Sequence, residues 1–122
     1  MTKINVAQNC KLLEIISAAC LEIQQALNEH LESTTNTQYR ADIEKDLVTL
    51  ENLKLITIAV KRDIELDMVG ASAELLLRIA ANDFKNKLAL IPEKKTLRNE
   101  VMKSLKEVHD NILHLTIREA TA

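Results

Sequence analysis

Residues that interrupt helices are almost absent from this chain. Its 122 residues include one glycine, Gly70, and one proline, Pro92. Glycine and proline form many tight turns and end many helices, so a chain with so few of them has few turns and long regular elements. Leucine, isoleucine, alanine, glutamate and lysine dominate the rest of the composition. This balance favours helix and predicts an all-α fold.

Apolar residues recur at three- and four-residue intervals along four segments, which is the spacing of amphipathic helices. The expected helices cover residues 4–32, 38–69, 73–90 and 92–118. Small polar residues fill positions 33–37 and favour a turn there. Gly70 is expected to end the second helix in a left-handed conformation, and Ser72 is expected to cap the third. Four such helices with short connections predict one domain over residues 1–122, an antiparallel up-down four-helix bundle.

The second expected helix carries apolar residues on two opposite sides. The stripe expected to face the core is formed by Ile43, Leu47, Leu50, Leu53, Ile64 and Met68. The opposite stripe is formed by Val48, Leu55, Ala59 and Leu66. One apolar face is enough to close a bundle core, so the second stripe predicts that something else packs there.

The third expected helix repeats this feature on a smaller scale. Its buried side is expected to consist of Leu76, Leu77, Ala80, Phe84 and Leu88. Leu75 and Ile79 lie on its other side, and the spare stripes of the two helices could merge into one surface. The competing interpretation is that the helix crossings widen the core until it includes them.

Charge is distributed unevenly, although the formal net charge is only −2. Residues 85–106 hold seven basic side chains against Glu93 and Glu100, a local balance of +5, so the remainder carries −7. A basic segment can bind nucleic acid through counterion release. The residues that would do so are Lys94, Lys95, Arg98, Lys103 and Lys106. Against this, the chain has only two aromatic residues, and acidic residues expected at the same end of the bundle could neutralise the segment.

The pattern of reactive residues gives no support for a catalytic, cofactor or metal site. A carboxylate-bridged di-iron bundle uses Glu-x-x-His pairs, but Leu27, Lys106 and Asn111 stand three residues before the three histidines. Zinc and haem motifs need clustered cysteine and histidine, and phosphate loops need glycines that this sequence lacks. His30 and His109 are interpreted as packed side chains that reach water. The sequence therefore predicts a non-enzymatic protein without metal or cofactor.

The two cysteines bear on the cellular compartment. Cys10 and Cys20 would lie about 15 Å apart along one helix, too far for a disulfide with each other. Two reduced thiols favour a cytoplasmic location. No segment approaches the roughly 18 apolar residues of a membrane span.

Together these patterns predict a small protein–protein interaction module: an adaptor, a chaperone-like protein or an inhibitor of the immunity type. We expect a homodimer or a complex with a protein partner, and neither a membrane nor a small-molecule substrate is expected. The candidate interface residues are Val48, Leu55, Ala59, Leu66, Leu75 and Ile79. The alternative function is a nucleic-acid-associated helical module that uses the basic segment.

Overall fold

The computed structural model describes residues 4–87 and 95–121, and every regular element in these two ranges is an α-helix. The four helices are α1 (Val6–Ser33), α2 (Thr37–Glu65), α3 (Ala71–Lys87) and α4 (Lys95–Thr121). They occupy the four segments that the apolar spacing indicated. The prediction of an all-α chain of four helices is confirmed.

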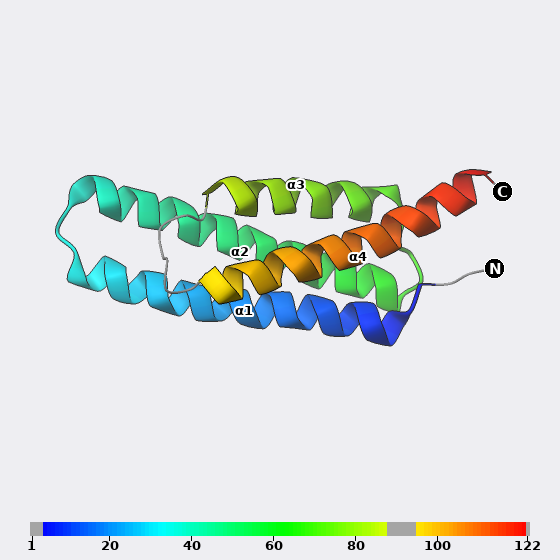
Figure 1. Ribbon diagram of the computed structural model, residues 1–122, viewed down its shortest axis with the longest axis horizontal. Coiled ribbons are helices and arrows are strands. Elements are labelled where there is room, and N and C mark those ends of the chain that lie inside the picture. The colour runs from blue at the N-terminus through cyan, green and yellow to red at the C-terminus, as the bar shows by residue number, and fades with distance from the viewer. Residues whose placement is uncertain (1–3, 88–94, 122) are drawn as a thin grey trace.

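Consecutive helices run in alternating directions, so α1 and α2 form one hairpin and α3 and α4 a second (Figure 1). α1 packs against α2 and α4, and α3 packs against the same two helices, which places the core between all four. With 17 residues, α3 is 12 residues shorter than α2, a difference of about 18 Å along the axis. The tip of the α1–α2 hairpin therefore extends beyond α3 (Figure 1).

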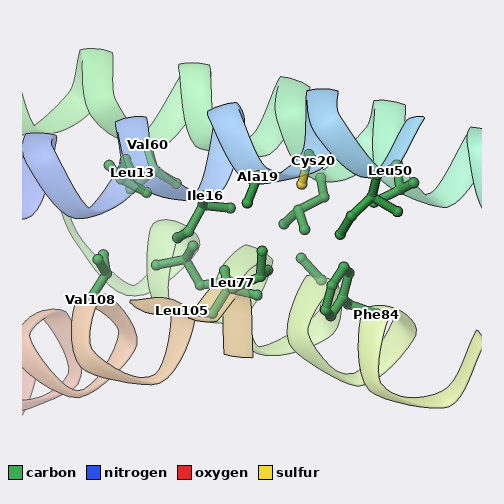
Figure 2. Close-up of a cluster of buried hydrophobic side chains, with 14 of the residues drawn as sticks. Leu13, Ile16, Ala19, Cys20, Leu50, Val60, Leu77, Phe84, Leu105 and Val108 are labelled. Carbon is green, nitrogen blue, oxygen red and sulfur yellow. The ribbon is translucent and has the colours of Figure 1, made fainter. Parts of the chain in front are cut away.

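All four helices contribute side chains to one apolar core (Figure 2). The residues at its centre include Leu13 and Ile16 of α1, Leu50 and Val60 of α2, Leu77 and Phe84 of α3, and Leu105 and Val108 of α4. Removing a side chain of this size from water contributes about 1.5–3 kcal/mol of stability. The apolar residues whose spacing predicted the helices are thus the same residues that hold the helices together.

Polar side chains fix where α1 begins and how it lies on α4. Asn5 Oδ1 accepts a hydrogen bond from Gln8 N at 2.9 Å, which caps the first turn of α1. One turn further along, the buried Asn9 donates from Nδ2 to Asn5 O at 2.8 Å and accepts at Oδ1 from Asn111 Nδ2 at 2.9 Å. Because a buried amide without partners is costly, this pair favours one register between α1 and α4.

The end of α2 differs from the sequence prediction. The helix stops at Glu65, and Asp67 adopts a left-handed backbone conformation with φ of 56°. Met68 N donates to Asp63 O at 2.8 Å and Asp67 N donates to Ile64 O at 3.2 Å, which are the two hydrogen bonds of a Schellman motif. The left-handed cap therefore falls on an aspartate, a residue type that tolerates this conformation better than most.

The prediction that Gly70 supplies the left-handed cap is consequently wrong, because Gly70 does not have a positive φ. Its carbonyl accepts from Ala73 N at 3.1 Å and from Glu74 N at 3.3 Å, so Gly70 occupies the N-cap position of α3. Ser72 lies inside the first turn of α3 and does not cap it, also contrary to prediction.

Two residues assigned to the core from their spacing are exposed. Met68 lies beyond the end of α2, where the helical period no longer applies, and is 70% exposed. Leu76 stands at the edge of the buried side of α3 defined by Leu77 and Phe84, and is 40% exposed. Leu88, also expected in the core, lies outside the described residues.

Candidate functional site

The outward side of α2 presents a line of apolar side chains to solvent. Val48, Leu55 and Leu66 are each more than half exposed, and Ala59 is also exposed. At 100° per residue, these four positions fall within about 40° of one another on the helix. The buried Leu50 of the same helix lies on its opposite side. The structure therefore places the second stripe of α2 outside the core.

Neighbouring α3 adds apolar side chains on its own exposed side. Leu75 is 45% exposed and Ile79 is 50% exposed. These two residues and the α2 stripe lie on the exposed sides of two helices that pack against each other. We call this set of residues the α2–α3 face: Val48, Leu55, Ala59, Leu66, Leu75 and Ile79. Three further apolar residues on or beside these helices are exposed although the sequence did not indicate it: Ile58, Met68 and Leu76. Met68 and Leu76 were assigned to the core instead, and only the observed helix end and helix placement reveal them as exposed.

Exposed apolar residues are concentrated on this part of the molecule. Among the described side chains, ten large hydrophobic residues are exposed, and eight belong to α2, α3 or the connection between them. The other two, Val6 and Leu21, are on α1. α4 contributes none among its described side chains. Charged residues of both signs, including Glu44, Lys45 and Arg62, border the stripe on α2.

The basic residues of the alternative, nucleic-acid function occupy varied environments. Lys95 is exposed at the start of α4, whereas the half-buried Arg98 donates from Nη2 to Lys85 O at 2.9 Å. Arg98 thus binds a carbonyl near the C-terminal end of α3. Lys103 and Lys106 are exposed and border a groove between α3 and α4. Lys94 lies outside the described residues.

This groove, which we call the α3–α4 groove, has a volume of about 510 Å³. Its apolar floor is formed by Ala81, Met102 and Leu105. Its polar rim is formed by Arg78, Asn82, Lys103, Lys106 and His109. The floor and rim resemble many small-molecule sites in chemistry, since such sites combine an apolar lining with a few polar groups.

One end of the groove is bridged by polar contacts around Glu74 and His109, which we call the Glu74–His109 cluster. Glu74 Oε1 of α3 lies 2.8 Å from His109 Nε2 of α4 and 3.6 Å from Arg78 Nε. His109 Nδ1 lies 3.4 Å from Asp110 Oδ1. The Glu74 and His109 side chains are both mostly buried, so their contact joins the two helices at this point.

The cysteines lie in environments that favour the protonated thiol. Burial raises the pKa of Cys20 to about 12, and Lys54 opposes the shift. The pKa of Cys10 is also raised, first by burial and then by Glu65. Because the thiolate is the nucleophilic form, neither environment activates its cysteine. No cluster of three or more histidine, cysteine or acidic side chains suited to a metal ion occurs among the described residues.

The fold and its surface define a class: a four-helix bundle with an apolar surface on its second and third helices. Comparisons with protein-family models, with curated proteins and with solved structures found no match to this chain. Within the described part of the chain, no helix is long and apolar enough to cross a bilayer. The surfaces of the bundle are therefore the features that indicate its function.

Proposed function

We propose that this protein is a non-enzymatic interaction module that self-associates through the α2–α3 face. The observation that carries the proposal is the concentration of eight of the ten exposed large apolar residues on α2, α3 and their connection. Extended exposed apolar surface on a small protein is characteristic of interaction sites. Burying several such side chains against a partner supplies the free energy that offsets the entropic cost of association.

We infer that the partner is a second copy of the chain. When two α2 helices are placed antiparallel, the apolar stripe of one matches the apolar stripe of the other. In an antiparallel pairing of two α2 helices about position 57, Val48 lies level with Leu66 of the second copy, and Leu55 with Ala59. The same register sets Arg62 near Glu51 of the second copy, on one side of the stripe. A two-fold interface repeats each of these contacts twice. Apolar contacts along the centre and ion pairs at the rim are the usual anatomy of such an interface.

The first experiment is light scattering across a hundredfold range of protein concentration. The chain mass is 13.7 kDa, so we expect a species near twice this mass at high concentration. Leu55→Glu is expected to abolish association and to leave the helical circular dichroism signal unchanged. Gln25→Glu adds the same charge to an exposed position on α1 and is the matched control. It should leave association unchanged.

A charge-reversal pair tests the register of the dimer. Arg62→Glu should weaken association by repelling Glu51, and the double variant Arg62→Glu/Glu51→Arg should restore it. A monomer at every concentration would contradict the proposal. Loss of folding in Leu55→Glu would contradict it in another way, because it would place this stripe in the core.

A further inference from the structure

The α3–α4 groove is a second surface feature, separate from the α2–α3 face. It runs from Arg78 to Asn82 on α3 and from Met102 to His109 on α4. Met102 and His109 are seven positions apart, which corresponds to about 10 Å along α4, so the groove is about two helical turns long. Its volume of about 510 Å³ lies within the usual range for small-molecule sites. These dimensions suit a compact ligand rather than a long polymer.

The floor of the groove requires an apolar body in any ligand that fills it. Leu105 is almost fully buried and forms part of the core, whereas Ala81 and Met102 are half-buried beside it. Methionine is unbranched and polarisable, so Met102 can adapt to an alkyl chain or a ring. A purely ionic ligand, such as inorganic phosphate, would leave this floor without contacts.

The cationic side chains of the rim favour a ligand that carries a negative charge. Lys103 and Lys106 stand three residues apart and therefore share one side of α4. None of the ion pairs found among the described residues involves either lysine. Arg78 borders the groove from α3, so cationic side chains approach from both helices. Glu74 pairs with Arg78, and Asp110 contacts His109. The three cationic side chains Arg78, Lys103 and Lys106 still outnumber these two carboxylates, so the charge around the groove is positive at neutral pH.

The Glu74–His109 cluster limits the width of the groove. The 2.8 Å contact between Glu74 and His109 crosses from α3 to α4 and limits how far the two helices can separate there. A site held by such a bridge exists before the ligand arrives, which lowers the cost of binding.

We propose that the α3–α4 groove binds a small amphipathic anion. An acidic head group lies between the Lys103 and Lys106 ammonium groups and the Arg78 guanidinium. An alkyl or aryl body of up to about 10 Å lies over Ala81 and Met102. This assignment fits the groove better than nucleic acid does. No phenylalanine, tyrosine or tryptophan lines the groove for base stacking, the His109 ring is held by Glu74, and a phosphodiester chain would not use the apolar floor.

Octanoate is the probe that tests the proposal, with octanamide as its neutral counterpart. Binding is measured by calorimetry and located by amide chemical-shift changes in two-dimensional NMR of the full chain. We expect octanoate to shift resonances of α3 and α4 around the groove, and octanamide to bind at least about tenfold more weakly, since charge-assisted hydrogen bonds are lost.

Substitutions then separate the head-group contacts from the floor. Lys103→Gln/Lys106→Gln should weaken octanoate binding at least about tenfold, whereas the matched control Lys95→Gln, at an exposed lysine outside the groove, should not. Ala81→Phe should block the probe by filling the floor while the circular dichroism spectrum stays helical.

Four results would overturn the proposal. The first is the absence of octanoate binding at millimolar concentration, and the second is equal binding of octanamide. The third is a set of chemical-shift changes confined to the α2–α3 face. The fourth is that a short oligonucleotide binds and octanoate does not, and that Lys103→Gln/Lys106→Gln abolishes the oligonucleotide binding. The last result would assign the basic rim to nucleic acid. None of these results depends on whether the protein dimerises, so this proposal and the proposed function fail independently.

Discussion

The two sides of α2 carry the same kind of residue in opposite environments. Leu53 is 1% exposed and faces the core, whereas Leu55, two positions later, is 56% exposed. α1 differs from α2, because its strongly periodic stripe is buried and only Val6 and Leu21 stand exposed among its large apolar residues. Apolar periodicity therefore predicts which sides of a helix are apolar. Whether an apolar side is buried depends on how many sides of that helix the bundle covers.

The sharpest test of this difference substitutes the two leucines in parallel. Leu53→Ala should lower the free energy of unfolding by about 2–5 kcal/mol, because it removes buried contacts and leaves a cavity. Leu55→Ala should change it by less than about 0.5 kcal/mol in the monomer, since an exposed side chain has little to lose. Urea denaturation at low protein concentration measures both changes. Equal losses would place Leu55 in the core and remove the distinction between the two sides.

The inward side of α2 also holds a carboxylate, and its titration provides a second test. Asp46 is 3% exposed, and its Oδ2 atom has no hydrogen-bond partner among the described residues. Burial, followed by repulsion from Asp42, raises the pKa of Asp46 to about 6. The folded protein therefore binds a proton on Asp46 more tightly than the unfolded chain, whose carboxyl has a pKa near 3.9.

The sign of the pH effect follows from this difference. Between about pH 4 and pH 6 the folded state binds more protons, so the contribution of Asp46 to stability falls as the pH rises through this range. Asp46→Asn should raise the free energy of unfolding by up to about 3 kcal/mol at pH 7 and have little effect at pH 4. Urea denaturation at both pH values measures this.

Asp42→Asn is the matched control, because it removes only the repulsion and should give a smaller gain at pH 7. A stability difference between Asp46→Asn and the unsubstituted protein that is the same at pH 4 and pH 7 would show that the Asp46 charge is not penalised by folding. The inward side of α2 would then tolerate charge as the outward side does.

The sequence was sufficient to predict the helices and the second apolar stripe of α2, because both depend on the spacing of residues within one segment. It placed Val48 and Leu55 on the side away from the core, where the structure has them. It could not supply features that depend on how helices meet. The Asn9–Asn111 contact joins positions 102 residues apart, and the α3–α4 groove exists only because α3 and α4 lie side by side.

The prediction of the left-handed cap of α2 from residue type was wrong, and the reason is physical. Glycine is the residue most often found in a left-handed helix cap, so Gly70 was the expected position. The helix instead ends earlier, and Asp67 adopts that conformation at some conformational cost. Spacing alone did not distinguish the two positions because Leu66 and Met68, on either side of Asp67, both continue the apolar pattern.

Asp67 sets the connection between α2 and α3, and thereby the relation between the two halves of the α2–α3 face. Asp67→Gly should raise the free energy of unfolding by about 0.5 kcal/mol, because relief of the left-handed conformation exceeds the entropy that glycine adds to the unfolded chain. Asp67→Ala, which keeps the Cβ atom and loses the side-chain oxygen, should lower it by a similar amount. Thermal and urea unfolding measure both variants. If Asp67→Ala were the more stable of the two, the left-handed cap would not exist in solution, and the outward stripes of α2 and α3 would have to be related by a different turn.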